Sequence, residues 1–227
     1  MFNMQPKIFF SCEAKTSRMR ESVFAFLFQG SFELRAKLGH ALQGRNPGTS
    51  LSSFVDGYVT RYAVEQTAYI SRNFDRELDR KCTKTQRLDL HGCPSAVDGC
   101  LEVGTEAFEA PEGLFKPELW GLDQAGVHVL VHKAIRECAT DIRKILTQNV
   151  FLAGGLTLLP GFPERLEAEL ERLNPSVKPR VLASPYRYHA AYLGACVQAG
   201  LDTFGDTMIT RDEFSLARSK LSRLWSL

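Results

Sequence analysis

The sequence predicts an α/β fold, in which a mixed sheet flanked by helices carries a small cap built from helices and one hairpin. Three observations predict it. Residues 149–162 (NVFLAGGLTLLPGF) begin with a short apolar run, as in a strand buried on both faces, which leads through paired glycines toward a helix. In ERLEAELERL (164–173) leucines recur at helical spacing between charged residues. Asp98-Gly99, between short apolar runs, is typical of a β-hairpin turn, whose central residues must accept a positive φ.

Four segments are expected along the chain: 1–30, 31–110, 111–195 and 196–227. The first holds the apolar runs IFF and VFAFLF, for which two short strands or a partly ordered tail fit equally well. The second forms the cap, with a loop over 45–50 and elements at Phe32–Leu42 (helix), Phe54–Leu78 (two helical segments), Leu88–Leu90 and Cys100–Val103 (hairpin strands). The third is the α/β body, with strands near 127–130, 149–153 and 179–183, and the last consists of short helices.

The turn after the strand at 149–153 is the richest local signal. Gly154 and Gly155 lack a Cβ, so the backbone there is free to bend sharply or to approach a ligand closely. Pro160-Gly161 marks a turn, and Pro163 suits the first turn of the following helix, where its missing N–H costs nothing. Several ATPase folds hold an adenosine on a strand–Gly-Gly–helix unit of this kind, although most Gly-Gly pairs are only turns.

Composition is that of an ordinary folded protein. The 227 residues are 44% hydrophobic, and 28 basic residues against 26 acidic ones leave no field that would attract nucleic acid or an anionic membrane. The longest apolar run, Val23–Phe28, is far shorter than the roughly 20 residues that span a bilayer, and the N-terminus lacks the features of a secretory signal. Six scattered cysteines predict a reducing compartment, the cytoplasm or the nucleus.

The order of the motifs resembles the C-terminal half of actin and the actin-related proteins. The matching pieces are 103–128, 139–146, 149–162, 165–173, 183–204 and 208–214, with a weaker match over 64–78. Together they cover about three-quarters of the chain. The resemblance implies half of an actin-type, ribonuclease-H-like ATPase fold, in which 31–110 is the cap-like subdomain. Residues 1–30 match no part of actin. The chain is similar to short divergent actin-like proteins, which are expected in specialised settings such as the sperm cytoskeleton.

The resemblance also sets what chemistry to expect. The family hydrolyses ATP with two Gly-rich hairpins, each carrying an aspartate that acts through Mg²⁺. Neither hairpin is found, because the residues after Asp56-Gly57 and Asp98-Gly99 do not continue as phosphate loops. We therefore expect no enzymatic activity and no catalytic residue.

Adenosine binding without hydrolysis is a separate question. The family's pocket residues carry over as Gly154, Gly155 and Glu65, whereas its two lysines fall at Val64 and Tyr188 and its aromatic residue falls at Leu159. One interpretation is a vestigial adenosine pocket. The other, which the two lost cations favour, is that the glycines remain because the turn needs them. No resident cofactor is expected, with ATP as the alternative.

No metal site is expected. His91, Cys93 and Cys100, with Cys82 upstream, include zinc ligands, but their spacing is not that of a zinc site and ordinary thiols fit better. His128 and His132 would share a face only if their segment were helical, and a structural role is expected of them.

These observations predict a non-catalytic, actin-like structural or scaffold protein of the cytoplasmic cytoskeleton. Its expected partners are proteins, including actin or other cytoskeletal proteins, and neither nucleic acid nor membrane. The alternative is an actin-related protein that binds ATP through the Gly-Gly turn when paired with a partner. Two surfaces are expected to need a partner: an uncovered strand edge in the body, and the apolar residues Tyr192, Leu193, Leu201, Phe204, Met208 and Ile209.

Overall fold

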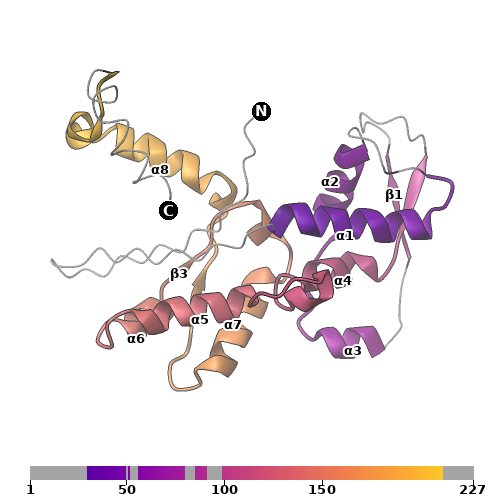
Figure 1. Cartoon of the computed structure of the whole chain (residues 1–227), viewed down its shortest axis with the longest axis horizontal. Helices are drawn as coiled ribbons and strands as arrows, with labels where there is room; N and C mark the ends of the chain where they lie inside the picture. Colours follow the sequence, from indigo (N-terminus) through magenta and orange to yellow (C-terminus); the bar gives the residue numbers. More distant parts are fainter. Residues whose placement is uncertain (1–29, 50, 52–55, 80–84, 91–98, 212–227) are drawn as a thin grey trace. The chain divides into compact units, whose positions relative to one another are not determined.

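The computed structural model describes residues 30–49, 51, 56–79, 85–90 and 99–211 (Figure 1). The chain divides into two compact units, and the division falls between Tyr188 and His189. The segment 1–30, which the sequence left unplaced, lies outside the described residues except for Gly30.

Three helices open the first unit. They are α1 (Gly30–Arg45), α2 (Asp56–Thr67) and α3 (Phe74–Asp79). α1 buries Leu34, Leu38 and Leu42, which recur every fourth residue and so form one apolar face against α2 and α4. The helix expected at Phe32–Leu42 is confirmed, as is the pair of helical segments expected over Phe54–Leu78.

The expected hairpin is present as the antiparallel strands β1 (Gln86–Asp89) and β2 (Cys100–Val103). Leu88 lies opposite Leu101, and both are buried. Leu90 donates its N–H to the carbonyl oxygen of Gly99 at 3.1 Å, so Gly99 belongs to the end of the ladder, and the connection is longer than the two-residue Asp98-Gly99 turn expected. The φ of Gly99 is +127°. Asp98 lies outside the described residues.

The remaining elements of the first unit alternate short helices with two very short strands. They are α4 (Glu106–Glu112), η1 (Pro117–Trp120), α5 (Val127–Glu137), α6 (Arg143–Thr147), β3 (Val150–Phe151), η2 (Gly155–Leu158), α7 (Phe162–Leu173) and β4 (Val181–Leu182). α7 is the amphipathic helix that the leucine spacing predicts, and it buries Phe162, Leu166 and Leu170.

The strand expected near 127–130 is wrong, because these residues form the first turn of α5. Val127 and Val131 are buried one helical turn apart, and Leu130 and Ile135 also pack against the core. The apolar positions therefore follow the helical repeat over eleven residues, although the first four residues alone read equally well as a strand.

The two other strands of the body lie where the sequence predicts them but are shorter. β3 occupies two residues of the expected 149–153 and pairs in parallel with β4, which occupies two residues of 179–183. Within the described residues the strands form two separate pairs, one antiparallel and one parallel, in place of the mixed sheet expected.

The second unit holds α8 (Ala190–Ala199) and η4 (Asp202–Thr207), preceded by η3 (Arg187–His189) at the division. Short helices were expected from residue 196, and the first of them already begins at Ala190. No residue of α8 is buried. Of the apolar residues expected to need a partner, all but the half-buried Phe204 are exposed: Tyr192, Leu193, Leu201, Met208 and Ile209. Among the described helices, none has both the length and the apolar character needed to cross a membrane.

Candidate functional site

The Gly-Gly turn joins β3 to η2. Gly154 has a φ of +100° and a ψ of 159°, a backbone conformation essentially restricted to glycine. Its N–H donates to the carbonyl oxygen of Arg187 at 2.9 Å, and its own carbonyl accepts from the Thr157 hydroxyl at 2.7 Å. The first glycine is therefore required by the path of the backbone, whether or not a ligand binds.

Gly155 lies beside the ring of Tyr188. A Cβ added to Gly155 would sit 3.4 Å from Cε2 and 3.7 Å from Cδ2 of that ring, which is ordinary van der Waals contact. Tyr188 is the residue that stands where the family has a lysine. The Gly-Gly turn is thus next to an aromatic side chain of this chain.

Glu65, on α2, is paired with a neighbour on the same helix. The Nε of Arg61 donates to Oε1 of Glu65 at 2.8 Å, and both side chains are about half exposed. The pKa of Arg61 is raised above its ordinary value, first by this hydrogen bond and by the charge of Glu65, and to a smaller extent by the nearby Tyr188. Tyr188 therefore lies near both the turn and Arg61.

Tyr188 thus lies beside Gly155 and near Arg61, which is paired with Glu65, so the structure links the three predicted residues Gly154, Gly155 and Glu65 through this tyrosine. Sequence reasoning missed Arg61, although its spacing of four residues from Glu65 is that of a helical ion pair. Val64 and Leu159, which stand at the other altered positions, are buried in the hydrophobic core.

A largely buried ion-pair cluster in the body was also missed by sequence reasoning. The guanidinium of Arg165 makes two hydrogen bonds to the Glu112 carboxylate, at 2.9 and 3.1 Å, and donates to the carbonyl oxygen of Ser71 at 2.7 Å. Its Nε donates to Glu169 at 2.7 Å. Burial alone would lower the pKa of Arg165, but the hydrogen bonds that it donates to Glu112 and Glu169 more than offset this and raise it.

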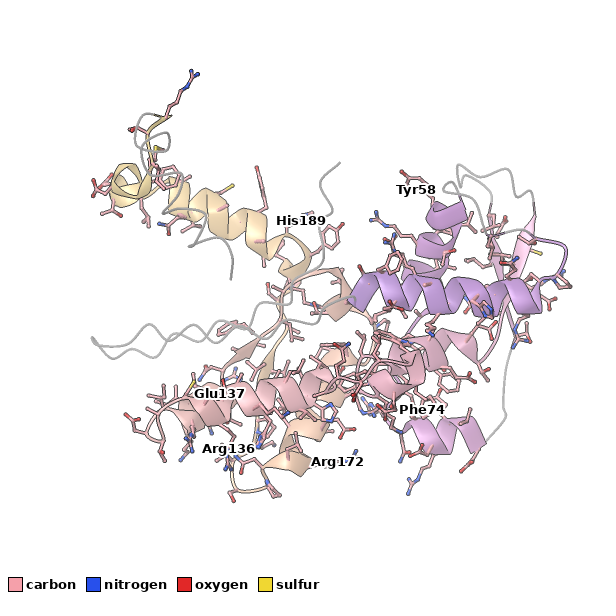
Figure 2. The ribbon with its side chains drawn as sticks, in the orientation of Figure 1. Tyr58, Phe74, Arg136, Glu137, Arg172 and His189 are labelled. Atoms are coloured by element: carbon pink, nitrogen blue, oxygen red, sulfur yellow. The ribbon has the colours of Figure 1, made fainter. Side chains whose placement is uncertain are left out.

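Aromatic rings and further charges extend this cluster. Arg165 lies over the ring of Phe115, 5.0 Å from its centroid, and Lys116 lies 4.9 Å from the centroid of Phe74. Arg172, labelled with Phe74 in Figure 2, donates to Glu169 at 2.9 Å. The cluster joins the loop before α3 to α4 and α7, so it positions elements of the fold.

Two cavities, of about 770 and 520 Å³, lie away from the Gly-Gly turn. The larger lies among α3, α4 and the ends of β1 and β2, and the smaller lies between the start of α3, η1, the start of α5 and α7. Neither is lined by Gly154, Gly155 or Glu65.

Within the described residues, no group of three histidine, cysteine or acidic side chains is arranged to hold a metal ion. Cys82, His91 and Cys93 lie outside the described residues, and Cys100 is an exposed free thiol. His128 and His132 do lie on a helix, α5, where His128 stacks on Phe115 with ring centroids 5.8 Å apart.

Comparison with known proteins agrees with this fold. The actin family matches over residues 29–221, so the chain belongs to the actin family. Centractin of Schizosaccharomyces pombe is 34% identical over 174 residues, which cover 76% of this chain and 45% of centractin. The match thus spans somewhat less than half the length of that relative.

Proposed function

We propose that this chain is a non-catalytic, structural member of the actin family, which acts in the cytoplasmic cytoskeleton as a scaffold that binds other proteins. Its family membership and its similarity to centractin support the cytoskeletal part of the proposal. The observation that carries the non-catalytic part is the occupied surroundings of the Gly-Gly turn, where Tyr188 lies against Gly155 and Arg61 holds Glu65.

This arrangement weakens nucleotide binding in two ways. Glu65 is already neutralised by Arg61, so a ligand hydroxyl would compete with an ion pair for its carboxylate. The two cations that the family resemblance implies are absent, because Val64 is in the core and Tyr188 is an uncharged phenol. Each lost charge-assisted hydrogen bond is worth about 1.5–3 kcal/mol, so the pair corresponds to a loss of roughly 10²–10⁴ in affinity.

Titration of the full chain with ATP by calorimetry, with and without Mg²⁺, tests this proposal. We expect no heat of binding up to millimolar nucleotide. Micromolar binding that is lost in a Gly155→Val variant would overturn the proposal, because the added side chain would then be blocking a working site. Gly48→Val is the matched control, since a Cβ at Gly48 meets nothing within 4 Å and its backbone is not in the left-handed region.

The alternative function, an actin-related protein that binds ATP when paired with a partner, has one observation in its favour. A Cβ on Gly154 would meet nothing within 4 Å, so one side of the turn is open among the described residues. For this alternative, calorimetry would show ATP binding only after a partner protein is added. ATP binding to a mixture of the chain and purified actin that exceeds the sum of the binding to each protein alone is the result that distinguishes it.

A further inference from the structure

The two edges of the parallel pair β3–β4 differ. Val150 donates its N–H to Arg180 and Leu152 donates its N–H to Leu182, each at 3.1 Å, so these two residues use the edge that faces β4. Alternate residues of a strand direct their backbone groups to opposite edges. The N–H and the carbonyl of Phe151 therefore point to the outer edge, and among the described residues neither has a hydrogen-bond partner.

The outer edge of β4 is closed by a side chain. The backbone N–H of Val181, which points away from β3, donates to Oε1 of Glu167 on α7 at 2.8 Å. A strand cannot be added there without displacing that carboxylate. Growth of this sheet is thus possible on the β3 side alone.

The outer edge of β3 has none of the features that protect a sheet edge. Val150, Phe151 and Leu152 include no proline and no charged residue, and the Phe151 side chain is 48% exposed. Parallel sheets are normally covered on both faces, and an isolated pair of two-residue strands is too small to be stable by itself. The edge is therefore suited to an extended, uncharged, apolar segment.

The position of α1 indicates which segment this is. α1 begins at the buried Gly30, where an added Cβ would lie 2.9 Å from Cδ1 of Leu156. Leu156 belongs to η2, which follows β3 along the chain, so the first residue of α1 lies against the turn after β3. Residues 23–28 (VFAFLF) end two positions before Gly30, and six residues reach up to roughly 20 Å when extended.

We propose that the outer edge of β3 is a docking edge for Val23–Phe28 of this same chain. The segment is uncharged, as the edge is, and it is rich in the aromatic and β-branched residues that suit strand pairing. Its backbone supplies the donor and the acceptor that Phe151 lacks among the described residues. The outer edge of β3 is a different surface from the Gly-Gly turn. The docking of Val23–Phe28 and the absence of ATP binding can therefore fail independently of each other.

Amide hydrogen exchange of the full chain, followed by NMR, tests the proposal at single residues. We expect the Phe151 amide to exchange on the order of a hundredfold more slowly than an exposed amide. Ala25→Pro and Phe24→Pro each remove one donor from the segment, and between them they cover both registers. At least one is expected to abolish the protection of Phe151. The amides of Val150 and Leu152, bonded to β4, stay protected and report that the fold is intact.

Ala14→Pro is the matched control, because it places a proline in the same N-terminal region outside 23–28 and is expected to leave Phe151 protected. Three results would overturn the proposal. The first is a Phe151 amide that exchanges like an exposed one. The second is protection that survives both prolines. The third is protection that increases with protein concentration, which would assign the edge to a second copy of the chain.

Discussion

The buried Glu112–Arg165 pair makes the sharpest prediction about stability. In Glu112→Gln the carboxylate charge is lost, and one of its two acceptor oxygens becomes an NH₂ group that faces the Arg165 guanidinium. Glu112 is fully buried and Arg165 is 5% exposed, so water cannot replace the lost interaction. Removing one partner of a buried pair costs about 3–5 kcal/mol. Arg165 keeps its bonds to Glu169 and Ser71, which places the expected loss near the lower end, at about 3 kcal/mol.

Urea unfolding followed by circular dichroism measures this loss. With a slope of about 1–3 kcal/mol per molar urea, the midpoint should fall by roughly 1–3 M. Glu65→Gln is the matched control, since it makes the same chemical change in the half-exposed pair with Arg61 and should cost no more than about 0.5 kcal/mol. Equal costs for the two variants would refute the reasoning, because burial would then not decide the strength of these pairs.

Two further predictions concern single residues. Gly154→Ala should destabilise the chain by about 1–3 kcal/mol, because φ at Gly154 is +100°. Gly57→Ala in α2 is the control, and it should leave the stability equal or raise it by up to about 1 kcal/mol. Thermal unfolding compares the two variants, and equal melting temperatures would contradict the argument that Gly154 is strained by a side chain. Burial lowers the pKa of His128 below its ordinary value of 6.5, so the unfolded chain takes up the proton more readily and stability should fall as pH drops below 6.5. His128→Asn should flatten this dependence in melting curves recorded between pH 7.5 and 5.5, and an unchanged slope would exclude His128 as its source.

The sequence predicts the elements whose signals are local and long. α1 and α7 carry apolar residues at helical spacing over several turns, and the bend at Gly154 needs a backbone that only glycine adopts readily. The second hairpin strand follows from the alternation of exposed and buried residues in β2. For these elements the residues that determine the structure are neighbours in the chain.

Short runs and distant contacts are harder to predict. Val127–Leu130 fits a strand or a helix, and only Val131 and Ile135 further along show the helical repeat. The Glu112–Arg165 pair joins residues 53 positions apart, and nothing near either residue indicates the other. At the candidate site the sequence identifies Gly154, Gly155 and Glu65, but the role of Tyr188 beside Gly155 appears only once the chain is folded.

We propose that this chain is a structural member of the actin family whose Gly-Gly turn holds no nucleotide. The most direct test compares the ATP affinity of the full chain with that of Tyr188→Lys, which restores one cation beside the turn at a half-exposed position. We expect no binding to the natural chain up to millimolar ATP, and at least a tenfold gain in affinity, about 1.4 kcal/mol, for the variant. Micromolar binding to the natural chain that Tyr188→Lys leaves unchanged would contradict it.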